Sequence, residues 1–241
     1  ALRRPSVRLH YDWGHMRETA TESAPAKVNL ALSVGPPGVD RMHPISSWMV
    51  TIDFGDDLTV TRLEEDSLSH YAILWHQDAP RRTEIDWSIT RDLAVRAHLA
   101  LERHVGRQLP VKLLLQKRIP VGGGLGGGSS NAAAMLRAVN RLFALDLDLG
   151  ALAEIGAGLG SDVPFLVHGG SAIVEGLGER VERMSAPEAH LVLIFPEASC
   201  PTGAVYAAFD RRSTGVLRAG DVRSLAASAR IDPDLLFNDL S

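Results

Sequence analysis

A run of glycines is the first stretch of the sequence whose residues could do chemistry. Residues 120–131 read Pro-Val-Gly-Gly-Gly-Leu-Gly-Gly-Gly-Ser-Ser-Asn. Because glycine has no Cβ, such a backbone adopts positive φ and brings consecutive N–H groups close to an anion. A flexible linker is the alternative, but Gly/Ser linkers seldom stand between two well-patterned elements. The stretch therefore predicts a phosphate-binding loop.

The elements on either side of the glycines support this interpretation. Residues 111–119 predict a strand, and the apolar residues Ala132, Leu136, Val139 and Phe143 predict a helix directly after the loop. The first turn of a helix presents unpaired N–H groups and roughly half a positive charge. We expect Ser129 or Ser130 to cap that turn.

Two common nucleotide motifs do not account for the glycines. A P-loop needs Gly-Lys-Ser/Thr at the helix start, whereas Gly128 is followed by Ser129. The glycine spacing does fit a dinucleotide fingerprint, but that motif also needs a second parallel strand carrying an acidic residue. Residues 145–150 instead lead from one predicted helix straight into the next. A nicotinamide enzyme is therefore disfavoured.

Two polar residues outside the loop could act on a bound phosphate. Residues 26–34 alternate strictly and predict a strand with Lys27 and Asn29 side by side on its polar face. A lysine in such a place is usually just solvated. Asp162 lies between two predicted helices, ahead of Pro164, where capping the following helix is the alternative role.

The remaining pattern indicates a mixed fold. Glycines and turn residues predict a hairpin around Gly55 and Asp56, between strands at 46–54 and 57–62. The pattern of residues 63–90 does not fix their structure. Further expected elements are helices at 92–105 and 149–159, strands at 170–174, 180–184 and 190–195, and a helix from 201 through Tyr206 and Phe209.

Composition limits the class of protein. The chain has 241 residues, 45% of them hydrophobic, and a formal net charge of −4, which predicts one or two globular domains without general affinity for nucleic acid or acidic membranes. Cys200 is the single cysteine, as expected of a cytoplasmic protein without disulfides. Residues 1–23 are polar and aperiodic, and we expect an arm there rather than a secretory signal.

The motifs together resemble the GHMP kinase superfamily. Residues 120–132 are similar to its Pro-x-x-x-Gly-Leu-Gly-Ser-Ser-Ala motif. Residues 25–30 (Pro-Ala-Lys-Val-Asn-Leu), 160–164 (Gly-Ser-Asp-Val-Pro) and 238–240 (Asn-Asp-Leu) narrow the resemblance. They are similar to the family in this superfamily that phosphorylates the 2-hydroxyl of 4-diphosphocytidyl-2-C-methyl-D-erythritol in the non-mevalonate pathway of isoprenoid biosynthesis.

The resemblance implies an α+β fold with two domains. Residues 24–160 would form an ATP-binding domain of ribosomal-S5-domain-2 type, and residues 161–241 a partial ferredoxin-like substrate domain. The superfamily's third, glycine-rich motif does not occur in the sequence, which ends at Ser241. We therefore expect the second domain to be truncated relative to the family.

The resemblance also implies the roles of individual residues. Asp162 would take the proton of the attacking hydroxyl, and Lys27 would pair with Asp162 and stabilise developing charge. Mg²⁺ would accompany ATP, and the sequence identifies no protein ligand for it. ATP would bind on Pro120, Val121, Gly122, Gly123, Gly124, Leu125, Gly126, Gly127, Gly128, Ser129 and Ser130.

Substrate contacts are implied for Asn29, His43 and Tyr206. Asn29 would meet the erythritol end, His43 would hydrogen-bond cytosine, and Tyr206 would stack on it. The sequence departs from the family pattern Asp-Gly-Tyr-His at this point, because Arg41 replaces glycine and Met42 replaces tyrosine. Met42 offers a polarizable substitute for the lost ring. Two alternatives stay open: a related kinase of mevalonate-like or sugar substrates, and a non-catalytic nucleotide-binding relative.

Overall fold

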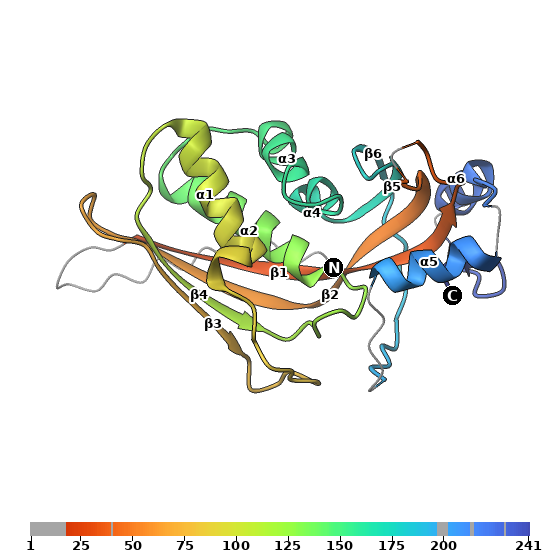
Figure 1. Ribbon diagram of the computed structural model, residues 1–241, viewed down its shortest axis with the longest axis horizontal. Helices are drawn as coiled ribbons and strands as arrows, with labels where there is room; N and C mark the ends of the chain where they lie inside the picture. Colours follow the sequence, from red (N-terminus) through yellow and green to blue (C-terminus); the bar gives the residue numbers. More distant parts are fainter. Residues whose placement is uncertain (1–17, 40, 197–201, 213–214, 229) are drawn as a thin grey trace.

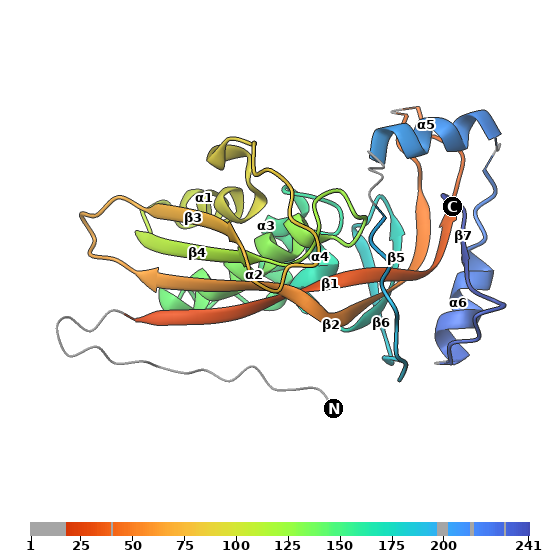
Figure 2. The ribbon, with the colours of Figure 1, turned by 90° about the horizontal axis from the view of Figure 1, so that it is seen from below.

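The computed structural model describes residues 18–39, 41–196, 202–212, 215–228 and 230–241, which form a long curved sheet with helices packed on it (Figures 1 and 2). Residues 1–17 of the expected arm lie outside the described residues, and the first strand begins at Thr19. The elements are β1 (Thr19–Val34), β2 (Ile45–Arg62), β3 (His70–Trp75), η1 (Ile89–Arg91), α1 (Leu93–Val105), β4 (Val111–Lys117), α2 (Gly127–Leu142), α3 (Leu149–Ala157), α4 (Val163–His168), β5 (Ser171–Gly176), β6 (Arg180–Met184), α5 (Thr202–Arg212), α6 (Ala219–Ser228) and β7 (Phe237–Asn238).

Two long antiparallel strands, β1 and β2, organise the sheet. β2 pairs with β4 through Asp57–Arg62 and with β5 through Ile45–Val50. β3 pairs with β4, β6 pairs with β5, and β7 pairs with β1. The sheet therefore continues across the expected domain boundary between residues 160 and 161, because β5 pairs with β2. The division into 24–160 and 161–241 stays a prediction.

The predicted hairpin around Gly55 and Asp56 is wrong. Residues 45–62 form the single strand β2, in which Gly55 pairs with Pro25 of β1. A Cβ built on Gly55 would lie 2.6 Å from the carbonyl oxygen of Ala24. The glycine thus allows two strands to approach closely, which is the other common reason for a glycine inside a strand pattern.

Helices α1–α4 cover one face of the sheet over β1, β2 and β4 (Figure 1). α2 packs against β1 and α1, and its alanines at 132–134 and 138 are fully buried. Their small side chains let the helix lie close to the sheet. Side-chain caps set the starts of α1 and α3. Asp92 accepts a hydrogen bond from Ala94 N at the start of α1, and Asp148 accepts one from Ala151 N at the start of α3.

The C-terminal part of the chain packs against the ends of β1 and β2. β5 and β6, at the predicted strands 170–174 and 180–184, pair antiparallel, and α6 buries Val222 against Leu30 and Trp48. The predicted strand at 190–195 is wrong, and Val192 is 89% exposed. Its apolar residues alternate, but a strand also needs a neighbour for its backbone hydrogen bonds, and the described residues provide none.

Within the described ranges, none of the helices has the length and apolar character that crossing a membrane requires.

Candidate active site

The predicted phosphate loop lies between the end of β4 and the start of α2. Gly122, Gly124 and Gly126 have φ values of 73°, 71° and 70°, which residues with a Cβ rarely adopt. The first hydrogen bond of α2 runs from Ser130 N to Gly126 O. The N–H groups of residues 127–129 precede that bond and can meet an anion. The backbone of the loop is therefore compatible with the predicted phosphate site, which stays a prediction.

The predicted side-chain cap on α2 is wrong. Gly126 is the N-cap residue, and no side chain caps the helix. Its left-handed backbone favours glycine over serine at this position. Ser130 Oγ instead donates a 2.7 Å hydrogen bond to Pro25 O, and this contact ties the start of α2 to β1.

A second contact ties β1 to the loop at Lys27. The pairing register of β1 with β2 shifts between Pro25 and Lys27, and irregularities of this kind often lie next to functional sites. Lys27 N donates a 2.9 Å hydrogen bond to Leu125 O. This hydrogen bond holds Lys27 against the glycine loop.

Three polar side chains come together beside the loop. Two of them, Lys27 and Asn29, share one face of β1, and the third, Asp162, is far from them in the sequence. Lys27 Nζ lies 3.6 Å from Asp162 Oδ2 and donates to Asn29 Oδ1 at 3.3 Å. The side chains of Lys27 and Asp162 are 9% and 25% exposed, so solvent screens their charges less than it would at an open surface. Asp162 makes no side-chain capping bond to α4. Its carboxylate is therefore not used as a helix cap.

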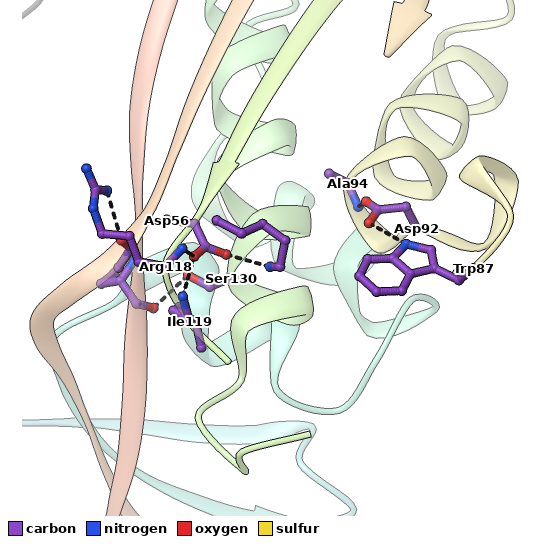
Figure 3. Close-up of polar contacts among 10 residues, drawn as sticks. Asp56, Trp87, Asp92, Ala94, Arg118, Ile119 and Ser130 are labelled. Carbon is purple, nitrogen blue, oxygen red and sulfur yellow. Dashed lines mark hydrogen bonds and ion pairs between the residues drawn. The ribbon is translucent and has the colours of Figure 1, made fainter. Parts of the chain in front are cut away.

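A buried ion pair that the sequence analysis missed holds the entry to the loop. Asp56 and Lys117 are 0% and 4% exposed, and their charged atoms are 2.7 Å apart. Asp56 Oδ1 also accepts hydrogen bonds from the backbone N–H groups of Arg118 and Ile119, at 2.6 and 2.7 Å (Figure 3). These two residues lead directly to Pro120. The sequence does carry one signal for this ion pair, an acidic residue inside a strand-like run, but we assigned that residue to a turn.

The residues expected on the substrate side also meet. The ring centroids of His43 and Tyr206 are 5.2 Å apart, and Phe209 lies edge-on to His43 at 5.9 Å. Burial raises the pKa of the Tyr206 hydroxyl, and the negative charge of Asp162 raises this pKa further. The charge of the Asp162 carboxylate thus acts on the Tyr206 hydroxyl.

Arg41, which replaces the glycine of the family pattern, has a strained backbone conformation. Arg41 has a φ of 63°, a left-handed conformation that costs a residue with a Cβ about 1–2 kcal/mol. Arg41→Gly is expected to raise the free energy of unfolding by about 0.5–1 kcal/mol, after the larger backbone entropy of glycine is subtracted. Urea unfolding measures this change.

Arg211→Gly is the matched control for that prediction. Arg211 lies in α5, where glycine should lower the free energy of unfolding by about 1 kcal/mol. If both glycine variants were destabilised alike, the left-handed strain assigned to Arg41 would be wrong.

The region around the glycine loop identifies the class of protein to which the chain belongs. Residues 92–170, from Asp92 through the glycine loop to Gly170, match the family model of the GHMP kinases N-terminal domain. The crystal structure of homoserine kinase from Cytophaga hutchinsonii has a TM-score of 0.59 at 15% identity, covering 90% of this chain and 69% of that chain. At that identity the likeness concerns the fold alone. The predicted α+β fold of GHMP kinase type is confirmed.

Sequence similarity identifies the family more closely. The chain is 41% identical over 218 residues to 4-diphosphocytidyl-2-C-methyl-D-erythritol kinase of Anaeromyxobacter sp., covering 90% of this chain and 68% of that kinase. The kinase of the same name from Bacillus pumilus is 39% identical over 193 residues. A crystal structure of 4-(cytidine 5'-diphospho)-2C-methyl-D-erythritol kinase has a TM-score of 0.68 at 30% identity, covering 92% of this chain and 75% of that chain. The chain belongs to this family of GHMP kinases.

The alignment does not extend over the full length of these relatives. The aligned part covers 78% of this chain and 63% of the Bacillus pumilus kinase, and 76% of this chain and 59% of the kinase from Paraburkholderia phymatum. The chain thus spans about three-fifths of the length of these curated relatives.

Proposed function

We propose that the protein transfers the γ-phosphate of ATP to the 2-hydroxyl of 4-diphosphocytidyl-2-C-methyl-D-erythritol. The observation that carries the proposal is the Lys27–Asp162 pair, 3.6 Å apart and tied through Lys27 N to the glycine loop. The names of the relatives support the choice of substrate. ATP would lie with its phosphates on residues 120–130, and the erythritol end of the substrate beside Asn29.

Asp162 is the base of the proposed reaction. Its carboxylate takes the proton of the substrate hydroxyl while the hydroxyl oxygen forms a bond to the γ-phosphorus. The bond between that phosphorus and the bridging oxygen breaks, and ADP leaves with the electron pair. Base catalysis of this kind contributes about 10²- to 10⁴-fold to a rate.

Lys27 and the loop would stabilise the charge that develops during transfer. The Lys27 ammonium lies beside the proposed base, and the N–H groups at the start of α2 would face the phosphates of ATP. No cluster of three or more metal-ligating His, Cys, Asp or Glu side chains occurs in the described part of the chain. A Mg²⁺ ion that accompanies ATP would be held mainly by the ATP phosphates and water, with Asp162 the carboxylate at the reacting end. When bound, Mg²⁺ would neutralise phosphate charge.

Gly126→Ala is expected to lower turnover by about a hundredfold, since small misplacements of catalytic groups have effects of that size. A Cβ on Gly126 would lie 2.9 Å from Lys27 Cγ, so the Lys27 side chain would have to shift from its position beside Asp162. Steady-state ADP formation, with urea unfolding in parallel, measures the effect.

Gly124→Ala is the matched control, because its φ is also left-handed but nothing lies within 4 Å of its Cβ. Both variants carry backbone strain of about 1–2 kcal/mol. Equal losses of turnover in the two variants would contradict the role given to the Gly126–Lys27 contact.

A coupled assay of ADP release tests the proposed function. Purified protein with Mg-ATP is supplied in turn with the cytidyl alcohol, mevalonate, a sugar and no alcohol. We expect ADP release to depend on the cytidyl alcohol alone. Release with mevalonate or the sugar instead would indicate a related kinase, and no alcohol-dependent release would indicate a non-catalytic nucleotide-binding protein.

A further inference from the structure

Lys27 and Asp162 reach the candidate site from two different elements. Lys27 lies in β1, whereas Asp162 is the N-cap residue of α4. Their charged atoms are 3.6 Å apart, which is beyond hydrogen-bond distance, so the pair does not fix its own geometry. The contacts that join α4 to the strands therefore set the separation of the two side chains.

Thr51 of β2 joins the two elements. In the pairing of β1 with β2, Thr51 lies directly opposite Lys27, and opposed side chains of antiparallel strands lie on the same face of a sheet. Its hydroxyl oxygen accepts a 2.9 Å hydrogen bond from Gly170 N. Thr51 N donates to Gly170 O at 2.8 Å. A single residue thus binds both polar backbone groups of Gly170.

Gly170 lies where α4 is connected to β5. α4 ends at His168, and Gly169 and Gly170 lead directly into β5 (Figure 1). Both glycines have left-handed φ values, 65° and 77°, and Gly169 N donates to Phe165 O inside the helix. α4 has six residues, a length of about 9 Å. A shift at Gly170 is therefore transmitted along a short helix to Asp162 at its other end.

Arg137 provides a second connection between α4 and the sheet. It donates to Leu166 O and Val167 O at 3.0 and 3.2 Å, and its Nε donates to Glu22 of β1. This connection runs through a long side chain with many rotamers. Thr51 is β-branched and has few rotamers, so its contact with Gly170 holds the end of α4 more rigidly.

We propose that Thr51 is a positioning residue, which sets the separation of Lys27 and Asp162 by holding the C-terminal end of α4 against β2. The inference rests on the proposed function, because the separation matters only if the two side chains act on a substrate. Without the hydroxyl, Gly170 N loses its acceptor and α4 can shift relative to β1. A misplacement of about 1 Å at a catalytic group costs up to about a hundredfold in rate.

Steady-state ADP release with the cytidyl alcohol tests the role of the hydroxyl. Thr51→Val removes the hydroxyl and keeps the branched shape of the side chain. We expect kcat to fall about tenfold. The KM values for ATP and for the cytidyl alcohol should change by less than about twofold, because binding of the ground state is not affected. Thr51→Ser keeps the hydroxyl and should restore kcat to within about twofold of the wild type.

Thr59→Val is the matched control. Thr59 lies in the same strand as Thr51 and is also partly buried, and its hydroxyl makes no hydrogen bond within the part of the chain that the structure describes. We expect this variant to keep the wild-type kcat. If Thr51→Val were as active as Thr59→Val, or if Thr51→Ser were as slow as Thr51→Val, the role of the Thr51 hydroxyl would be wrong.

A double-mutant cycle tests whether Thr51 acts through Asp162. The Asp162→Asn protein has no base to position, so adding Thr51→Val should lower its residual kcat by less than about twofold. A further loss of about tenfold in that background would show that Thr51 acts independently of Asp162, and it would overturn the proposal.

The outcomes distinguish this inference from the proposed function. If the wild type phosphorylates the cytidyl alcohol but Thr51→Val has the wild-type kcat, the role of Thr51 is wrong and the kinase assignment stands. If the wild type does not phosphorylate the cytidyl alcohol at all, the proposed function fails and this inference fails with it.

Discussion

Asp162→Asn is expected to lower kcat by about 10²- to 10⁴-fold, which is the usual contribution of a general base. The amide keeps the size of the side chain but cannot take up the proton of the attacking hydroxyl. ATP affinity should change little, because the carboxylate lies beside Lys27 at the reacting end while the glycine backbone binds the phosphates. Steady-state ADP release and a separate measurement of nucleotide binding give the two values.

Lys27→Met should lower turnover in the same way, since it removes the ammonium that lies 3.6 Å from the base. Glu154→Gln is the matched control, because Glu154 is an exposed acid on α3, away from these contacts. Wild-type turnover in either the Asp162 or the Lys27 variant would exclude the catalytic pair that we assign.

Lys117→Met is expected to lower the free energy of unfolding by about 3–5 kcal/mol, because it leaves the fully buried Asp56 carboxylate without its counter-charge. The loop entry should loosen as well, since Asp56 also accepts from Arg118 N and Ile119 N. We therefore expect a higher KM for ATP at temperatures where the variant remains folded. Urea unfolding and ATP kinetics measure the two effects.

A surface ion pair provides the control for this prediction. Glu182 accepts from Arg223 at 2.7 Å with both side chains about half exposed, and Glu182→Gln should change stability by less than about 1 kcal/mol. Replacing both buried charges, as in Asp56→Leu with Lys117→Met, should recover part of the loss. A Lys117→Met variant as stable as the Glu182→Gln control would show that the buried pair does not hold the loop.

Local sequence predicted those parts of the fold that depend on local interactions. The strand, glycine loop and helix over residues 111–142 follow from hydrophobic periodicity and from the φ values that only glycine adopts readily. The caps at Gly106 and Asp148 are local in the same sense, because each contacts the backbone of its own helix. Each of these features involves neighbours within a few residues along the chain.

Features that depend on distant contacts were missed or misassigned. Asp56 and Lys117 are 61 positions apart, and only the pairing of β2 with β4 brings them together. Gly55 was interpreted as a turn because its close contact with Ala24 of β1 is invisible to a local pattern. Lys27 and Asp162 were connected through family resemblance, since neither residue's local sequence specifies the 3.6 Å approach.

Transfer of labelled phosphate tests the central claim most directly. Protein is incubated with γ-³²P-labelled ATP and 4-diphosphocytidyl-2-C-methyl-D-erythritol, and the labelled product is located by chromatography and its phosphorylated carbon by NMR. We expect the wild type to place the label on the 2-hydroxyl of the cytidyl alcohol, and Asp162→Asn to place almost none there. Label that appears only as inorganic phosphate, or on a different hydroxyl, would contradict the assignment of substrate and site.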